Sequence, residues 1–135
     1  MHNYIGRMIL LVNDYEEASK FYEKNFGFKR IHDVTTDTGQ RFLQIGTGEP
    51  NSCALWFLRA DGQSQKNTIG KQTSGQPAMV IYTDTFDQLY QRILDNHVAV
   101  TIKPVNTPGY QYFHCLDLYG NEIIVVNLTG PPIIL

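Results

Sequence analysis

Apolar and polar positions divide the chain into two halves with the same order of elements. In the first half, an apolar run of strand length at residues 5–12 precedes a segment, 15–26, whose apolar residues recur at helical spacing. Three further runs of strand length follow at 28–35, 40–45 and 53–58. The first half is therefore predicted to form one strand, one helix and three more strands.

The second half repeats this order. Residues 77–83 are predicted to form a strand, and residues 84–96 a capped helix with its apolar side chains on one face. Three strands follow at 98–105, 110–116 and 122–128. Corresponding landmarks lie 70 residues apart, because Asp14 matches Asp84 and Gly27 matches His97. This repeat indicates a duplicated unit that cannot bury its own sheet alone.

The ends of both predicted helices carry capping residues. Asp14 is followed three residues later by Glu17, which is a variant of the capping box with Asp in the first position. Gly27 stands where a helix commonly ends in a left-handed conformation. Asp84 and Thr85 are predicted to cap the second helix.

Together these elements predict a single α+β domain spanning residues 1–135. Two tandem βαβββ modules, at 4–58 and 77–128, are expected to form a curved eight-stranded mixed sheet with the helices on its outer face and a cleft on the other. The polar stretch at 59–76 is interpreted as a connection, either a plain linker or a flap over a pocket. The apolar tail at 129–135 either packs across a subunit interface or frays.

Composition narrows the class of protein. Of the 135 residues, 42% are hydrophobic and 18% are charged, and the formal net charge is −2. This balance argues against broad nucleic-acid binding, which needs a cationic face. No apolar run approaches the roughly 20 residues of a membrane helix, and no signal-peptide pattern opens the chain, so a cytoplasmic protein is expected. Cys53 and Cys115 are expected to be small buried thiols in strands rather than a disulfide.

Two groups of residues resemble a known superfamily. The first is VND at 12–14, leading into A-x-x-F-Y at 18–22 and FGF at 26–28. The second is FHCLDLYGNEI at 113–123, which contains an Asp-x-x-Gly-Asn turn between two strands. Both resemble the vicinal-oxygen-chelate superfamily, which includes glyoxalase I, bleomycin-resistance proteins, fosfomycin-resistance enzymes and extradiol dioxygenases. The resemblance covers nearly the whole chain and implies a small-molecule ligand and a homodimer.

In the metal-using members, the resemblance implies that four strand positions supply His and Glu ligands to one divalent cation. In this chain those positions hold Arg7, about Trp56, Gln76 or Pro77, and Ile124. A guanidinium has no lone pair to offer, the indole of Trp56 and the sec-butyl group of Ile124 offer no ligand atom, and a glutamine offers only a neutral carbonyl. We therefore expect no metal and no cofactor, and a cleft that binds an organic ligand directly.

Aromatic residues make up 12% of the chain, and several are expected to line the cleft. For each ring the alternative is ordinary core packing. Arg7 is expected at the floor of the cleft, where it meets an anionic group or stacks on a ring. His114 is interpreted either as a hydrogen-bonded sheet residue or as a ligand-contacting donor or base. The candidate ligand-binding residues are Arg7, Phe42, Trp56, Tyr110, Tyr112, His114, Glu122 and Ile124.

The sequence leaves more than one function open. The favoured hypothesis is a small-molecule binding protein of the glyoxalase and bleomycin-resistance type, with an aromatic or drug-like ligand such as an antibiotic in a metal-free cleft. One alternative is a glyoxalase-like lyase or isomerase, or a dioxygenase, with a divalent metal held by other ligands. Another is a metal-free enzyme that uses His114 or Glu122 as its base.

Overall fold

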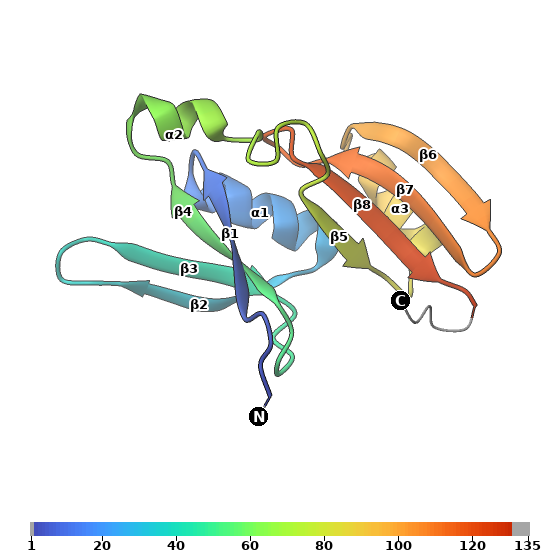
Figure 1. Cartoon of the computed structure of the whole chain (residues 1–135), viewed down its shortest axis with the longest axis horizontal. Coiled ribbons are helices and arrows are strands. Elements are labelled where there is room, and N and C mark those ends of the chain that lie inside the picture. The colour runs from blue at the N-terminus through green and yellow to red at the C-terminus, as the bar shows by residue number, and fades with distance from the viewer. Residues whose placement is uncertain (1, 131–135) are drawn as a thin grey trace. The chain divides into compact units, whose positions relative to one another are not determined.

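The computed structural model describes residues 2–130 (Figure 1). Within this range the chain forms eight strands and three helices. In chain order they are β1 (Arg7–Val12), α1 (Tyr15–Phe26), β2 (Lys29–Thr35), β3 (Arg41–Gly46), β4 (Ala54–Arg59), α2 (Gly62–Thr68), β5 (Met79–Tyr82), α3 (Phe86–Asp95), β6 (Val100–Thr107), β7 (Tyr110–Leu116) and β8 (Glu122–Leu128). The chain divides into two compact units, and the boundary follows Gln72.

Each unit contains one βαβββ module, which confirms the predicted α+β fold. The strand order is β1-β4-β3-β2 in the first unit and β5-β8-β7-β6 in the second. In each sheet the first strand of the module pairs in parallel with the last, and the other pairs are antiparallel. The hydrogen bonds therefore make two four-stranded sheets. The two sheets together supply the eight strands of the predicted mixed sheet.

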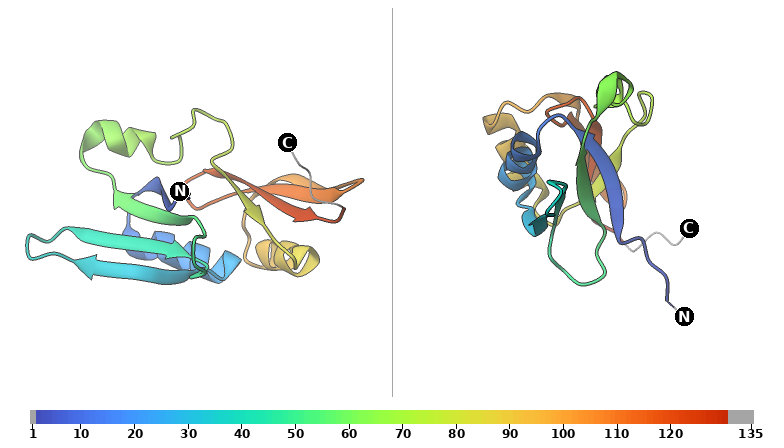
Figure 2. Two further views of the ribbon diagram at one scale, coloured as in Figure 1. Left: turned by 60° about the horizontal axis from the view of Figure 1, so that its bottom comes forward. Right: turned by 90° about the vertical axis from the view of Figure 1, so that its left-hand side faces the viewer.

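One face of each sheet is covered by the helix of its own module (Figure 2). In the first unit, the Tyr22 ring of α1 lies 5.8 Å from the Phe57 ring of β4, and both side chains are fully buried. In the second unit, Phe86 of α3 makes an edge-to-face contact with Phe113 of β7 at 5.3 Å. Full burial of such a side chain stabilises the fold by about 1.5–3 kcal/mol. The opposite face, which carries the alternate residues of each strand, is the distal face of the sheet.

Helix α1 begins and ends as predicted. Asp14 has an extended backbone, and its carboxylate accepts a hydrogen bond of 3.1 Å from the N–H of Glu16. Gly27 follows the helix in the left-handed conformation, with φ of 69°, and its N–H donates to the carbonyl of Glu23. The local sequence therefore determines both boundaries of this helix.

The repeat between the modules is offset by 71 residues at the helix start, not by 70. The N-cap residues are Asp14 and Thr85, so Asp84 lies one position before the cap. Thr85 makes no side-chain capping bond, and its N–H donates instead to the hydroxyl of Thr83 at 3.1 Å. Buried helix positions keep the same spacing, with Ala18 and Tyr22 in α1 matching Leu89 and Ile93 in α3.

The predicted match of Gly27 with His97 holds at the helix ends. His97 has a φ of 58°, close to the 69° of Gly27, although histidine rarely adopts this conformation. Gly27 and His97 lie 70 positions apart, whereas the two N-cap residues lie 71 positions apart. The second helical segment is therefore one residue shorter than the first between these two landmarks.

Charged side chains tie α1 to strands β2 and β3. Arg30 contacts Glu16 at 2.8 Å and Glu23 at 2.9 Å. Arg41 contacts Glu16 and Asp33, at 2.8 Å each. Hydrogen bonds from the two arginines lower the pKa of the Glu16 carboxyl from 4.5 to about 2. Both guanidiniums are therefore engaged within the fold.

The turn at residues 117–121 gives the second signature a structural role. The buried Asp117 carboxylate accepts hydrogen bonds of 2.9 Å from the N–H groups of Tyr119 and Asn121. Its other oxygen accepts from the side-chain amide of Asn121 at 2.8 Å. Gly120 has a φ of 92°, which favours glycine at this position. The Asp-x-x-Gly-Asn pattern therefore forms the turn that leads β7 into β8.

The stretch at 59–76, interpreted as a connection, contains helix α2. None of the residues of α2 is buried and its side chains are polar all round, so apolar periodicity gives no indication of it. A side-chain hydrogen bond of 2.7 Å between Gln63 and Asn67 spans one of its turns. This helix is therefore stabilised by local polar contacts rather than by a buried face.

One expectation about the cysteines is wrong. Cys115 is buried in β7, and burial raises the pKa of its thiol to about 12. Cys53 is exposed, because it precedes β4 rather than lying in it. No helix among residues 2–130 combines the length and the apolar content that a membrane crossing requires. Residues 131–135 of the apolar tail lie outside the described residues.

Candidate functional site

Three of the predicted contact residues form a row on the distal face of the second sheet. Tyr110, Tyr112 and His114 alternate along β7 with the buried Phe113 and Cys115. The rings of Tyr110 and Tyr112 are stacked with centroids 5.9 Å apart, and the His114 ring lies 5.7 Å from that of Tyr112. All three side chains are half-buried. Strand alternation therefore places a continuous row of rings on the face away from α3.

His114 is held by a carboxylate from the neighbouring strand. Its Nδ1 lies 3.1 Å from Oε2 of Glu122, the first residue of β8, and the Thr101 hydroxyl donates to the same oxygen at 3.3 Å. An ionised carboxylate only accepts hydrogen bonds, so Nδ1 carries the proton of the contact with His114. In the neutral ring, Nε2 is then an acceptor. The pair therefore orients one basic nitrogen beside the row of rings.

Ile124 adds an apolar surface to the same face. It pairs with His114 of β7 on one side and with Val80 of β5 on the other. Val80 and Tyr82 lie on this face as well, and their side chains are 49% and 68% exposed. The distal face of the second sheet therefore combines aromatic rings, one oriented imidazole and exposed hydrocarbon.

The first unit has a smaller aromatic group on its own distal face. The Phe42 and Trp56 rings lie 5.7 Å apart, and Trp56 pairs in register with Gln44. Arg7 donates from Nε to Oε1 of Gln44 at 2.5 Å and from Nη1 to the carbonyl of Gly6 at 2.6 Å. Within residues 2–130, the buried Nε1 of Trp56 has no hydrogen-bond partner. Buried donors are normally satisfied, so this unpaired indole N–H is unusual.

Arg7 makes hydrogen bonds rather than ion pairs within the described residues. No carboxylate in the described part of the chain forms an ion pair with it. With Tyr4, Ile31 and Ser52, it lines a pocket of about 270 Å³ at the start of the first sheet. Glu49 lines the same pocket, and the role of Arg7 toward an anionic group stays a prediction.

A family model matches residues 4–125, which include the first module and all of the second except the last three residues of β8. It describes the Glyoxalase/Bleomycin resistance protein/Dioxygenase superfamily. The chain belongs to this superfamily. An uncharacterized protein of Shewanella frigidimarina (strain NCIMB 400) is 32% identical to it over 139 residues, which cover 97% of this chain and 99% of the relative.

Two solved structures share the fold of this chain. UcmS2 is 19% identical, with a TM-score of 0.77, and the match covers 93% of this chain and 98% of that one. TnmS3, an antibiotic binding protein from Streptomyces sp. CB03234, is 23% identical, with a TM-score of 0.75 and coverage of 95% and 98%. At these identities the likeness shows the shared fold.

The donor set of this superfamily member does not fit a metal centre. The first and fourth implied positions hold Arg7 and Ile124, and Trp56 stands near the second. The 71-residue offset moves the third position from Gln76 or Pro77 to Ala78, whose side chain has no donor. Among residues 2–130, no group of three or more His, Cys, Asp or Glu side chains is placed to hold a metal ion. A zinc, manganese or iron site needs such converging groups.

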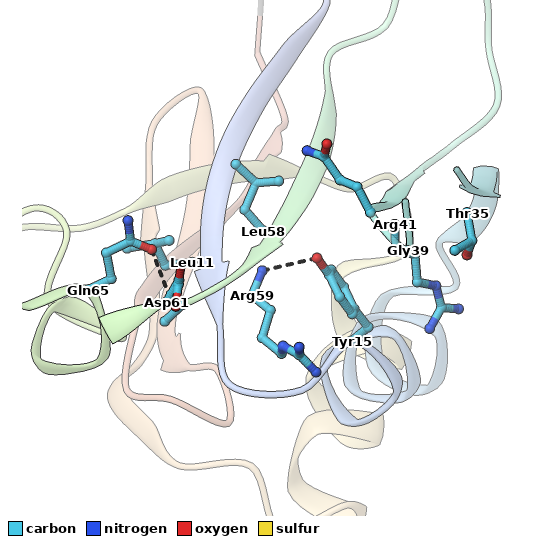
Figure 3. A pocket seen from close by; sticks show the side chains of 11 residues that line it. Leu11, Tyr15, Thr35, Gly39, Arg41, Leu58, Arg59, Asp61 and Gln65 are labelled. Atoms are coloured by element: carbon cyan, nitrogen blue, oxygen red, sulfur yellow. Dashed lines mark hydrogen bonds between the residues drawn. The ribbon is translucent and has the colours of Figure 1, made fainter. Parts of the chain in front are cut away.

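A pocket that the sequence did not predict lies at one end of the first sheet. Its volume is about 700 Å³, and its walls come from β1, the β2–β3 turn with the adjoining strand ends, the start of α1, the end of β4, and residues 60–65, which include the start of α2 (Figure 3). None of the eight predicted contact residues lines it. Arg59 and Asp61 were visible in the sequence as charges after an apolar strand. That Arg59 and Asp61 line a pocket depends on residues far from them in the sequence, which form the rest of its wall.

Proposed function

We propose that the chain binds a flat aromatic or drug-like small molecule through ring contacts, without a metal ion. The row of rings on the distal face of the second sheet, which ends at the His114–Glu122 hydrogen bond, carries this proposal. Rings on a sheet face without its helix offer stacking surface to a planar ligand. The shared fold of TnmS3, which is an antibiotic binding protein, supports the same class of ligand.

The contact residues have separate roles in this proposal. Tyr110 and Tyr112 stack on the ligand, and each ring contact contributes about 0.5–1.5 kcal/mol beyond the area buried. His114 hydrogen-bonds a polar group through Nε2. Trp56 and Arg7 offer a second aromatic surface with one cation. The proposed set is Arg7, Phe42, Trp56, Tyr110, Tyr112, His114, Glu122 and Ile124.

A panel of planar aromatic antibiotics, screened by thermal shift and measured by calorimetry, tests the proposal. Tyr112→Ala is expected to weaken binding of any compound found by about tenfold, or 1.4 kcal/mol, because a central ring contact is lost. Tyr119→Ala, in the 117–121 turn, is the matched control and should leave affinity unchanged. Equal affinities of the wild type and Tyr112→Ala would contradict the assigned surface.

The His114–Glu122 pair favours a second candidate function. A histidine oriented by a carboxylate can take a proton from carbon next to a carbonyl, as a metal-free lyase or isomerase requires. A bound compound that carries such a proton would then exchange it for deuterium in heavy water. His114→Gln should abolish this exchange, while His32→Gln, at an exposed position on β2, should not. Exchange at the same rate in His114→Gln would exclude the base.

We also propose that two copies of the chain associate and that the protein works in the cytoplasm. Exposed apolar side chains on the edge strands support association, since Met8, Ile9, Val80 and Tyr82 are each about half exposed or more. Sedimentation at micromolar concentration is expected to give the mass of a homodimer. A monomer under these conditions would refute this part of the proposal.

A further inference from the structure

We propose that the pocket at the end of the first sheet is a second ligand site, for a small zwitterion with an apolar body, such as a free aromatic amino acid. Its volume of about 700 Å³ is in the range of small-molecule sites. It is separate from the residues of the proposed function, because none of them lines it. This inference therefore goes beyond the binding of a flat aromatic compound.

Apolar groups form part of the pocket wall. Leu11 comes from β1 and Leu58 from β4, and both side chains are half-buried. Tyr15, the first residue of α1, presents its ring beside the end of β4 (Figure 3). Hydrocarbon or an aromatic ring of the ligand would lose water-exposed area against these side chains, which favours binding.

Two opposite charges line the same pocket without neutralising each other. Within residues 2–130, no ion pair joins Arg59 to Asp61, or either of them to another side chain. Arg41 also lines the pocket, but its guanidinium is paired with Glu16 and Asp33. A ligand with both a carboxylate and an ammonium group could pair both available charges, whereas a singly charged ligand leaves one unpaired.

The backbone around these charges is held in place. The Tyr15 hydroxyl accepts a hydrogen bond of 3.3 Å from the N–H of Arg59, so its own proton remains available to a ligand carboxylate. The N–H of Ala60 donates to the carbonyl of Val12 at 2.9 Å. The N–H of Asp61 donates to the side-chain carbonyl of Gln65, also at 2.9 Å. Arg59 and Asp61 therefore extend from an anchored segment.

Gln72 fastens the far end of the segment that carries Asp61 to the same sheet. Its side-chain carbonyl accepts from the N–H of Leu11 at 2.7 Å, and its amide donates to the carbonyl of Ile9 at 3.2 Å. The single amide thus pairs with the edge of β1 as a neighbouring strand would. The α2 wall of the pocket is therefore tied to the sheet at both ends.

Three probes that differ only in their charged groups test the assignment. L-phenylalanine carries both charges, 3-phenylpropionate lacks the ammonium group, and 2-phenylethylamine lacks the carboxylate. By calorimetry or NMR titration of the full chain, L-phenylalanine should bind at least about tenfold more tightly than either analogue. Arg59→Gln should remove its advantage over 2-phenylethylamine, and Asp61→Asn its advantage over 3-phenylpropionate.

Matched variants in the second unit separate a local effect from a general change in charge. Arg92→Gln and Asp84→Asn alter exposed residues and should leave the affinities for all three probes unchanged. Tyr112→Ala should also keep L-phenylalanine binding, so failure here is distinguishable from failure of the distal-face proposal. Absence of binding by every probe, equal affinity for all three, or the same loss in a control variant would overturn the zwitterion site.

Discussion

Asp117 provides a test of whether the second superfamily signature is structural. Asp117 is 5% exposed, and its carboxylate accepts hydrogen bonds from the N–H groups of Tyr119 and Asn121 and from the Asn121 amide. At about 1–1.5 kcal/mol net for each bond, Asp117→Ala should lower the free energy of unfolding by about 3–4.5 kcal/mol. Asp117→Asn retains an oxygen for the two backbone donors and should lose about 1–2 kcal/mol.

Urea denaturation followed by circular dichroism measures these differences. The slope of the free energy of unfolding against urea concentration should be the same in all variants, because the surface exposed on unfolding is unchanged. Asp37→Ala, at an exposed position in the β2–β3 turn, is the control and should change stability by less than about 0.5 kcal/mol. A loss below about 1 kcal/mol in Asp117→Ala would refute the hydrogen-bond reasoning. Loss of ligand binding without loss of stability would refute the purely structural role.

Three further predictions concern the thiols, the charge network and the helix end. In the native protein one thiol, that of Cys53, should react with a disulfide reagent at pH 8, and Cys115 should react only after denaturation, because burial raises its pKa to about 12; rapid reaction of two thiols would contradict this. The Glu16 pKa falls on folding from 4.5 to about 2, so the carboxylate's contribution to stability is present above about pH 4.5 and is lost as pH falls through 2. Glu16→Gln should therefore be less stable than wild type at pH 7 and equally stable below pH 2. A constant difference in stability across this pH range would contradict the prediction. Gly27→Ala should lower the free energy of unfolding by about 1 kcal/mol, because φ is 69° although nothing lies within 4 Å of the new Cβ; an unchanged midpoint in urea would show that the left-handed conformation costs nothing there.

Alternation along a strand was sufficient to predict which residues share a face. Tyr110, Tyr112 and His114 lie on one side of β7 because successive side chains point in opposite directions. The sequence also placed Glu122 near this group, but not its hydrogen bond. That contact depends on the register between β7 and β8, in which Leu116 faces Glu122 and His114 faces Ile124.

The one-residue error in the repeat has a local cause. Asp14 is an N-cap with a side-chain hydrogen bond, and Asp84 resembles it in the sequence. In the second module the chain begins its helix after Thr85, where the Thr83 hydroxyl accepts the Thr85 N–H. When several polar residues follow one another, each of them can act as the N-cap of a helix. Residue type alone therefore does not decide at which of them the helix begins.

The sequence by itself determined the two modules, the ends of α1, the tight turn at 117–121 and the absence of metal donors from the implied ligand positions. These features depend on alternation, capping and turn chemistry, which act between residues close together in the chain. Only the tertiary structure decided that the strands make two sheets, that His114 meets Glu122, and that Leu11, Tyr15, Leu58, Arg59 and Asp61 line one pocket. Those contacts depend on strand order and on the path of α2, whose polar side chains carry no periodic pattern because none of them is buried.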